Sequence, residues 1–299
     1  MDIDWWHPPI VDLTSYYGQN NTTIHCLDLS KVHPVISGNK FYKLWGHLEA
    51  FKNASKKGIV SMGGAHSNHL HALSYYCFEH KIPFIALIRQ AGADINTTPT
   101  CRDLKKWGTT IIPLNPSRFR ELRKLENYQS HLSSQSGDDW FWIPEGGKGD
   151  LGNQGLRRLF TSHVKNYSTI FINVGTGTSL LSLLQLPFAN QQKIIGIAPF
   201  KKVHEQIQEV SRVIGHKNNW EILADPWNLG FGKVNEEVIS FVENFKKDTN
   251  IDLDYIYTSR LFYKTHTYFN SCNTEFKEKV LLIHGGGLQG NRAISHINK

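Results

Sequence analysis

A lysine on a short turn is the first residue of this sequence whose type and surroundings suit covalent chemistry. Lys40 follows Ser37-Gly38-Asn39 and precedes an apolar stretch with helical spacing. Schiff-base chemistry requires a lysine amine that is neutral and held near an aldehyde, and a turn beside an anion site provides such a position. Most lysines at helix starts are simply solvated, so Lys40 alone leaves both interpretations open.

Three glycine-bearing turns follow apolar runs, and each could present backbone N–H groups to an anion at the start of the next helix. The strongest is Gly175-Thr176-Gly177-Thr178, where two glycines let the backbone close around a phosphate and two hydroxyls add donors. An ordinary strand-to-helix connection would explain the same residues. This turn lacks G-x-G-x-x-G, and the sequence contains no G-x-x-x-x-G-K-[ST], so a dinucleotide or P-loop function is not supported.

A second polar cluster lies where an apolar run ends and a helix begins, in Gly63-Gly64-Ala65-His66-Ser67-Asn68-His69. Open α/β sheets bind ligands at the carboxyl ends of their strands. Ser67, Asn68 and His69 together offer hydroxyl, amide and imidazole groups to a carboxylate. Serine and asparagine are also preferred helix N-caps, which would explain Ser67 or Asn68 without any ligand.

The elements that must position these residues alternate between strands and helices. Leu44, Leu48 and Phe51 recur at helical spacing within residues 41–57, which predicts a helix. Further helices are predicted at residues 68–79 and 179–186, and strands at residues 58–62, 83–88, 169–174, 193–198 and 280–284. Strand, glycine turn, helix and strand form the βαβ pattern of a parallel sheet, so we expect an α/β fold with two sheets or one long one. Residues 115–139 are rich in Ser, Arg and Gln and predict a solvated helix with a mobile tail.

The bulk composition is that of a folded enzyme-like protein. The chain has 299 residues, of which 40% are hydrophobic and 20% charged, and its length suits one large domain or two smaller ones. Its first 17 residues do not read as a signal peptide, and no apolar stretch approaches the roughly 20 residues of a membrane helix. We therefore expect a cytoplasmic protein with no membrane partner.

Charge and cysteines exclude two further classes of function. The net charge of +7 comes from lysines that stand singly or in pairs, with no basic stripe interleaved with aromatic residues. Nucleic-acid binding is therefore not expected, although anionic small molecules would be mildly attracted. Cys26, Cys77, Cys101 and Cys272 are widely spaced, which indicates inert thiols and no metal site.

Taken together, the motifs resemble a family of pyridoxal-phosphate enzymes with the tryptophan synthase β-subunit fold, in the branch of 1-aminocyclopropane-1-carboxylate deaminase and D-cysteine desulfhydrase. Seven segments match in family order and span most of the chain. They are Gly38-Asn39-Lys40-Phe41-Tyr42-Lys43-Leu44, residues 63–69, Ile143-Pro144-Glu145-Gly146-Gly147, residues 175–178, Gly232-Lys233-Val234-Asn235-Glu236-Glu237, residues 254–258 and His284-Gly285-Gly286-Gly287-Leu288.

The resemblance implies roles for individual residues. Lys40 would bind pyridoxal 5'-phosphate covalently and move the substrate's protons once freed. Lys43 would hold the phosphate together with Gly175, Thr176, Gly177, Thr178 and Ser179. Asn68 would hydrogen-bond the cofactor's ring oxygen. Ser67 and the adjacent backbone would hold the substrate carboxylate, with Asn68 and His69 also among the substrate-binding residues. Ser67 would in addition supply a nucleophilic or proton-relaying hydroxyl. Tyr257 would face the substrate, and Thr258 would approach the pyridine nitrogen.

The resemblance also implies the architecture and the assembly. We expect two open, twisted, mostly parallel sheets with flanking helices. Residues 48–158 would form a small inserted α/β domain, and residues 1–47 plus 159–299 a large domain that binds the cofactor. A homodimer is expected from the family.

Three departures from the family affect the expected reaction. Thr258 stands where the deaminase has a glutamate, Phe231 replaces a second active-site tyrosine, and Gly285 replaces a threonine or a leucine. Thr258, which the desulfhydrase also has, favours D-cysteine desulfhydrase-like β-elimination with release of ammonia and a 2-oxo acid. Phe231 and Gly285 differ from both enzymes and leave another small amino acid open as the substrate. The alternatives are 1-aminocyclopropane-1-carboxylate deamination, a protein that holds the cofactor with little catalysis and, as a third class, a nucleotide-binding α/β domain.

Overall fold

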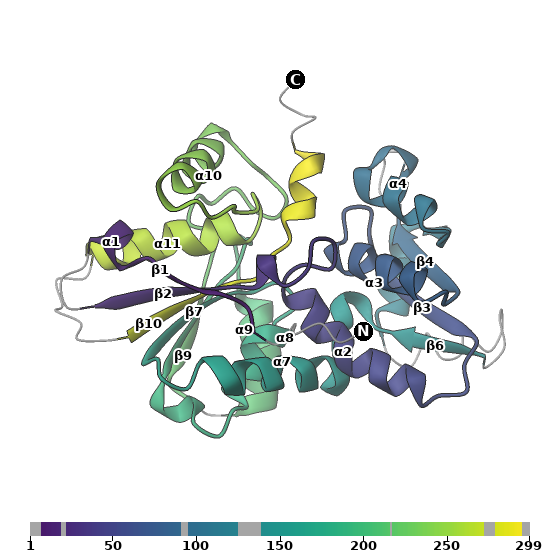
Figure 1. Cartoon of the computed structure of the whole chain (residues 1–299), viewed down its shortest axis with the longest axis horizontal. Helices are drawn as coiled ribbons and strands as arrows, with labels where there is room; N and C mark the ends of the chain where they lie inside the picture. The colour runs from purple at the N-terminus through teal and green to yellow at the C-terminus, as the bar shows by residue number, and fades with distance from the viewer. Residues whose placement is uncertain are drawn as a thin grey trace. The chain divides into compact units, whose positions relative to one another are not determined.

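The computed structural model describes residues 7–18, 22–90, 95–124, 139–215, 217–271 and 279–294. The chain divides into two compact units (Figure 1). Unit 1 contains Met1–Asn39 and Leu156–Leu288, and unit 2 contains Lys40–Gly155 and Gln289–Lys299. The predicted domain boundary at residue 48 falls within a helix that lies almost entirely in unit 2. That the larger domain binds the cofactor stays a prediction.

Unit 1 is built on a six-stranded sheet of described residues, in the order β1-β2-β10-β7-β8-β9. Only β1 runs antiparallel to its neighbour, and the other strands are parallel. The strands are β1 (Ile10–Asp12), β2 (Thr23–Asp28), β7 (Thr169–Asn173), β8 (Lys193–Ile197), β9 (Trp220–Leu223) and β10 (Lys279–His284). Because β10 and β7 are parallel neighbours, the turns after His284 and Asn173 leave the same edge of the sheet.

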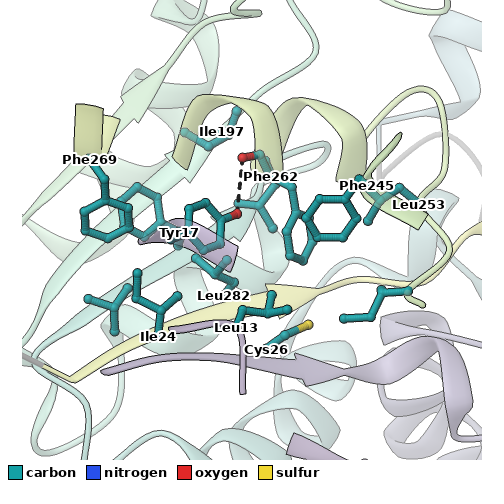
Figure 2. Packing of buried hydrophobic residues seen from close by; sticks show 14 of the residues in the cluster. Leu13, Tyr17, Ile24, Cys26, Ile197, Phe245, Leu253, Phe262, Phe269 and Leu282 are labelled. Carbon is teal, nitrogen blue, oxygen red and sulfur yellow. Dashed lines mark hydrogen bonds between the residues drawn. The ribbon is translucent and has the colours of Figure 1, made fainter. Parts of the chain in front are cut away.

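Helices cover both faces of this sheet (Figure 1). They are α1 (Thr14–Tyr17), α7 (Asp150–His163), α8 (Thr178–Leu184), α9 (His204–Ile214), α10 (Glu236–Thr249) and α11 (Thr258–Ser271), with 3-10 turns η1 (Leu29–Lys31) and η4 (Ala189–Gln191). Helix α7 begins in unit 2 and ends in unit 1. On one face, Phe245 of α10 and Phe262 of α11 pack against Cys26 and Leu282 of the sheet, and the Tyr17 hydroxyl donates to the Phe262 carbonyl at 3.3 Å (Figure 2).

Unit 2 is built on a four-stranded, fully parallel sheet of described residues, in the order β5-β4-β3-β6. Its strands are β3 (Gly58–Gly64), β4 (Phe84–Arg89), β5 (Thr110–Leu114) and β6 (Trp140–Ile143). Its helices are α2 (Asn39–Lys52), α3 (Asn68–Glu79), α4 (Pro99–Lys106) and α5 (Pro116–Leu122), with 3-10 turns η2 (Ile95–Thr97), η3 (Glu145–Gly147) and η5 (Leu288–Ala293).

Side chains along β3 alternate between the two faces of the second sheet, so successive residues contact different helices. Val60 and Met62 pack with Phe119 and Leu122 of α5 on one face. Ser61 points to the other face, where its hydroxyl contacts His69 of α3. The residues before α3 are therefore held at the carboxyl end of the central strand β3.

The expectation of two mostly parallel α/β sheets is confirmed. All five predicted strands form, and the predicted helix at residues 68–79 has the same bounds as α3. The helix predicted within residues 115–139 exists as α5, while residues 125–138 lie outside the described part of the chain. Cys26, Cys77 and Cys101 are free and buried, as expected, and Cys272 lies outside the described residues.

Candidate active site

A glycine turn in unit 1 fixes the start of the helix that carries Lys40. Asn39 donates its backbone N–H to the carbonyl of Gly285 at 3.0 Å, and its side-chain amide donates to Ser179 Oγ at 3.2 Å. A Cβ atom on Gly38 would overlap the Gly285 carbonyl oxygen, and Gly38 has a φ of +78°. Only glycine meets both conditions without strain. Lys40 is the next residue after this pinned asparagine.

The predicted phosphate turn follows β7 and leads into α8. Gly177 is the N-cap of α8 in the left-handed conformation, with a φ of 75° and no side-chain capping hydrogen bond. The hydroxyls of Thr176 and Thr178 are 2.9 Å apart. Backbone N–H groups at a helix start and adjacent hydroxyls form a donor set that suits an anionic oxygen. The chemistry of this turn fits a phosphate group.

Tyr257 lies beside this turn in unit 1. A Cβ atom on Gly175 would be 3.2 Å from Cε1 of the Tyr257 ring, so a larger residue at position 175 would press on the ring. The ring of Phe231 meets that of Tyr257 edge-on, with centroids 6.1 Å apart. The structure thus places Tyr257 between Phe231 and the turn that the sequence predicts to bind a phosphate.

The loops that carry Phe231 and Tyr257 are joined through a buried ion pair. Asp225 accepts hydrogen bonds from the backbone N–H groups of Trp227, Leu229 and Gly230. The guanidinium of Arg260 lies 3.5 Å from the Asp225 carboxylate and donates to the carbonyls of Tyr255 and Lys233. Both charged side chains are completely buried, so losing either would leave an uncompensated charge.

Thr258 is engaged by the chain itself. Its hydroxyl donates to Oδ2 of Asp254 at 2.7 Å and accepts from the backbone N–H of Asp254 at 2.7 Å, and the residue is fully buried. The Asp254 carboxylate also accepts from the N–H groups of Ile256, Tyr257 and Thr258. The only hydroxyl proton of Thr258 is therefore committed to Asp254. A contact of Thr258 with a pyridine nitrogen stays a prediction.

Ser67 in unit 2 is the N-cap of α3, since its hydroxyl accepts from the N–H of Leu70 at 3.2 Å. A Cβ atom on Gly63 would lie 2.7 Å from Ser67 Oγ, so glycine at the end of β3 makes room for this hydroxyl. Asn68 and His69 form the first turn of the helix. The capping role that the sequence left open is present, and the predicted roles of Ser67, Asn68 and His69 toward a substrate or cofactor stay predictions.

Unit 2 also concentrates positive charge around Lys43. Lys43 is 4% exposed, and burial lowers its pKa well below the ordinary value, with Lys40 and Lys148 lowering it further. A bound anion would favour the charged ammonium and offset these effects. This arrangement fits the phosphate of a cofactor at Lys43, as the resemblance implies.

Two polar residues of the structure are not among the residues predicted from the sequence. Asn173, the last residue of β7, donates from Nδ2 to the Tyr257 carbonyl at 2.6 Å, while its buried Oδ1 has no hydrogen-bond partner among the described residues. Asn173 could have been predicted from the sequence, because a polar residue at the end of a buried apolar strand is a candidate for a ligand-binding site. Gln289 donates from its amide to Oδ1 of Asn68 across 221 positions of sequence, and nothing local in the sequence indicates that contact.

Comparison with known proteins identifies relatives over most of the chain. No protein-family model matches. Three curated proteins do, each named "Putative 1-aminocyclopropane-1-carboxylate deaminase". The protein of Thermotoga maritima is 23% identical over 275 residues, covering 85% of both chains. Those of Pyrococcus horikoshii and Pyrococcus furiosus are 24% and 25% identical, covering 85% of this chain and 81% and 82% of theirs.

Solved structures share the fold. A crystal structure of an "ACC deaminase homologue" superposes with a TM-score of 0.77 at 23% identity and covers 97% of this chain and 94% of its own. The O-acetylserine-dependent cystathionine β-synthase of Helicobacter pylori superposes with a TM-score of 0.69 at 13% identity, covering 95% and 94%. The predicted resemblance and fold are confirmed: over most of its length this chain is similar to curated proteins named putative 1-aminocyclopropane-1-carboxylate deaminase, and it has the tryptophan synthase β-like fold.

Proposed function

We propose that this chain is a pyridoxal-phosphate-dependent lyase or deaminase that releases ammonia and a 2-oxo acid from a small amino acid. The observation that carries the proposal lies within unit 1. Asn39, which precedes Lys40, donates to both Gly285 and Ser179, so one residue joins the start of the lysine helix to the phosphate turn. The names of the curated relatives support a deaminase of this class.

The proposal assigns a role in binding, orientation or proton transfer to each of the predicted site residues. As the resemblance implies, Lys43 and the donors from Gly175 to Ser179 would hold the phosphate. Lys40 Nζ would hold the cofactor at its aldehyde carbon and would take the proton from the substrate's Cα. Ser67 orients the substrate carboxylate. The bound cofactor supplies an electron sink for the bond that breaks at Cα.

We favour β-elimination from D-cysteine as the reaction. Sulfide leaves from Cβ as Lys40 removes the Cα proton, and hydrolysis then gives pyruvate and ammonia. One feature of the sequence and one of the structure support this choice over cyclopropane opening, whose substrate has no Cα proton to remove. Thr258 replaces the deaminase glutamate, and its hydroxyl is bonded to Asp254, so it adds no charge near the ring.

A protein that holds the cofactor with little catalysis is the second candidate. Phe231 supports it, because this residue is 58% exposed and offers no hydroxyl beside Tyr257. Gly285 supports it as well, since it contributes no side chain. A cytoplasmic location and a homodimer stay predictions.

The decisive experiment measures 2-oxo acid and ammonia release from D-cysteine, L-cysteine and 1-aminocyclopropane-1-carboxylate on cofactor-saturated protein. Release from D-cysteine supports the elimination. Release from the cyclopropane substrate alone would replace it with deamination, and no release from any of a broad amino-acid panel would favour the second candidate.

Covalent trapping tests the lysine separately. Borohydride reduction of the cofactor-bound protein followed by peptide mass spectrometry should place the label on Lys40. Lys40→Ala should lose the label and the visible absorbance band, whereas Lys43→Ala should keep the label at reduced cofactor affinity. A label on any other lysine would refute the assignment.

A further inference from the structure

A hydrogen bond from the C-terminal part of unit 2 reaches Asn68, the residue proposed to contact the cofactor's ring oxygen. Gln289, in the 3-10 turn η5, donates from Nε2 to Oδ1 of Asn68. A Cβ atom on the next residue, Gly290, would lie 3.7 Å from the same oxygen, which is an ordinary van der Waals distance. The backbone of η5 therefore lies against the Asn68 amide.

The partners of Gln289 determine which way its amide points. Its Oε1 accepts from Nη2 of Arg292 at 3.0 Å and from the Thr100 hydroxyl at 3.4 Å. A guanidinium has only donors, so the oxygen of Gln289 must face Arg292 and its nitrogen must face Asn68. Asn68 consequently uses its oxygen toward Gln289, and Nδ2 is the group that its side chain can offer to an acceptor.

Arg292 is itself held in place by a carboxylate of α4. Its Nη2 donates to Oδ2 of Asp103 at 2.6 Å, and its Nε donates to the Gln289 carbonyl at 3.2 Å. The same carboxylate oxygen lies 2.9 Å from Nε2 of the buried His71. Although burial opposes it, the hydrogen bonds from Arg292 and His71 hold the pKa of Asp103 below its ordinary value.

We propose that Gln289 is a positioning residue that orients the Asn68 amide so that Nδ2 donates to the ring oxygen of pyridoxal phosphate. The proposal rests on the proposed function, because it needs the cofactor at Asn68. It assigns a role to a residue outside every motif of the resemblance. The order of donors and acceptors runs from Arg292 through Gln289 to Asn68.

The proposed donor has a measurable effect on the bound cofactor. A hydrogen bond from Asn68 Nδ2 draws negative charge from the ring oxygen, and that charge otherwise stabilises a proton on Lys40 Nζ. Reversing the Asn68 amide would place one oxygen against another and leave the proton on Lys40 more strongly bound. The pH midpoint of the visible absorbance should then rise.

Two substitutions at one position test this effect. Gln289→Glu keeps the shape and the contact with Arg292 but offers only acceptors, so Asn68 should turn Nδ2 toward position 289. Gln289→Met removes the hydrogen bond without reversing it. We expect the midpoint of Gln289→Glu to rise by about one pH unit and its cofactor affinity to fall about tenfold, with smaller changes in Gln289→Met.

The same Gln289→Glu substitution made in an Asn68→Ala protein shows whether the effect of Gln289 depends on Asn68. If Gln289 acts through Asn68, Gln289→Glu should shift the midpoint in the wild type and not in Asn68→Ala. Thermal unfolding of each apoprotein separates a general loss of packing from the spectral effect. An unchanged midpoint in Gln289→Glu, or an equal shift in the Asn68→Ala background, would overturn the role of Gln289. A wild-type protein that gains no visible band with the cofactor would instead refute the proposed function.

Discussion

Ser61 accepts a hydrogen bond from Nε2 of His69 at 2.8 Å, and this contact determines the tautomer of a buried histidine. The Ser61 hydroxyl has one proton and donates it to the carbonyl of Ile143 at 2.8 Å. The proton between Ser61 and His69 must therefore belong to His69 Nε2. Nδ1 is then an acceptor, and it has no hydrogen-bond partner among the described residues.

His69 should make stability depend on pH. Burial lowers its pKa well below the ordinary 6.5, and Lys40, His47 and Lys43 lower it further. Below pH 6.5 the His69 side chain binds a proton in the unfolded chain but not in the folded chain. The free energy of unfolding therefore falls as the pH falls from 6.5 to the lowered pKa of the folded protein. The free energy of unfolding should fall by up to about 1.4 kcal/mol per pH unit for this group.

His69→Gln should reduce this dependence, because glutamine can still donate to Ser61 and cannot be protonated. Chemical denaturation of both apoproteins between about pH 7.5 and about pH 5 measures the slopes. Part of the slope should remain in the variant, since burial also lowers the pKa values of His47 and His71. Identical slopes would show that His69 is not responsible.

The capping and proposed catalytic roles of Ser67 can be separated by two substitutions. Ser67→Ala should cost about 1 kcal/mol of stability through loss of the N-cap and should also lose most turnover. Ser67→Asn keeps an oxygen that can cap α3 and removes the hydroxyl, so it should retain stability and still lose turnover. Urea denaturation and steady-state rates are the two measurements. A fully active Ser67→Asn protein would reduce Ser67 to a helix cap.

The Asp254–Thr258 contact should limit which residues position 258 accepts. Thr258→Val leaves the Asp254 N–H and carboxylate short of a buried partner and should destabilise the protein by about 1–3 kcal/mol, whereas Thr258→Ser should cost less. Thr258→Glu would put a second carboxylate beside Asp254 and should be worse than Thr258→Val. Equal unfolding midpoints for valine and serine would mean that the hydroxyl contributes nothing.

Substitution by alanine should lower stability at Gly38 but not at Gly285, although the two glycines contact each other. Gly38→Ala places Cβ on the Gly285 carbonyl at a φ of +78°, so we expect a loss of at least about 1–3 kcal/mol and weaker cofactor binding at Lys40. Gly285 lies outside the left-handed region, and a Cβ atom there would be 3.7 Å from Asn173 Oδ1. Gly285→Ala should therefore fold normally. Comparable unfolding temperatures for both variants would contradict this contrast.

The strands that the sequence predicts are those inside the two sheets. Interior parallel strands such as β3 and β7 are buried on both faces, so they read as continuous apolar runs. The edge strands β1, β5, β6 and β9 were missed, because they are short and only partly buried. Interior strand β2 also escaped, since Thr23, His25 and Asp28 interrupt its pattern.

For the site, the sequence by itself determined the local features: a lysine after a glycine turn, two glycines before α8, and polar residues at the end of β3. These depend on neighbouring residues and on turn conformations that glycine favours. Only the tertiary structure decided that His69 carries its proton on Nε2 and that Gln289 donates to Asn68. The contact between Thr258 and Asp254 is local, since the two residues are four positions apart, but its hydrogen bonds were seen only in the structure. For His69 the deciding group is the single proton of the Ser61 hydroxyl, which goes to Ile143. For Asn68 it is the guanidinium of Arg292, which has only donors and so orients the Gln289 amide. Ile143 and Arg292 are distant in sequence from the residues that they decide, and folding brings them close.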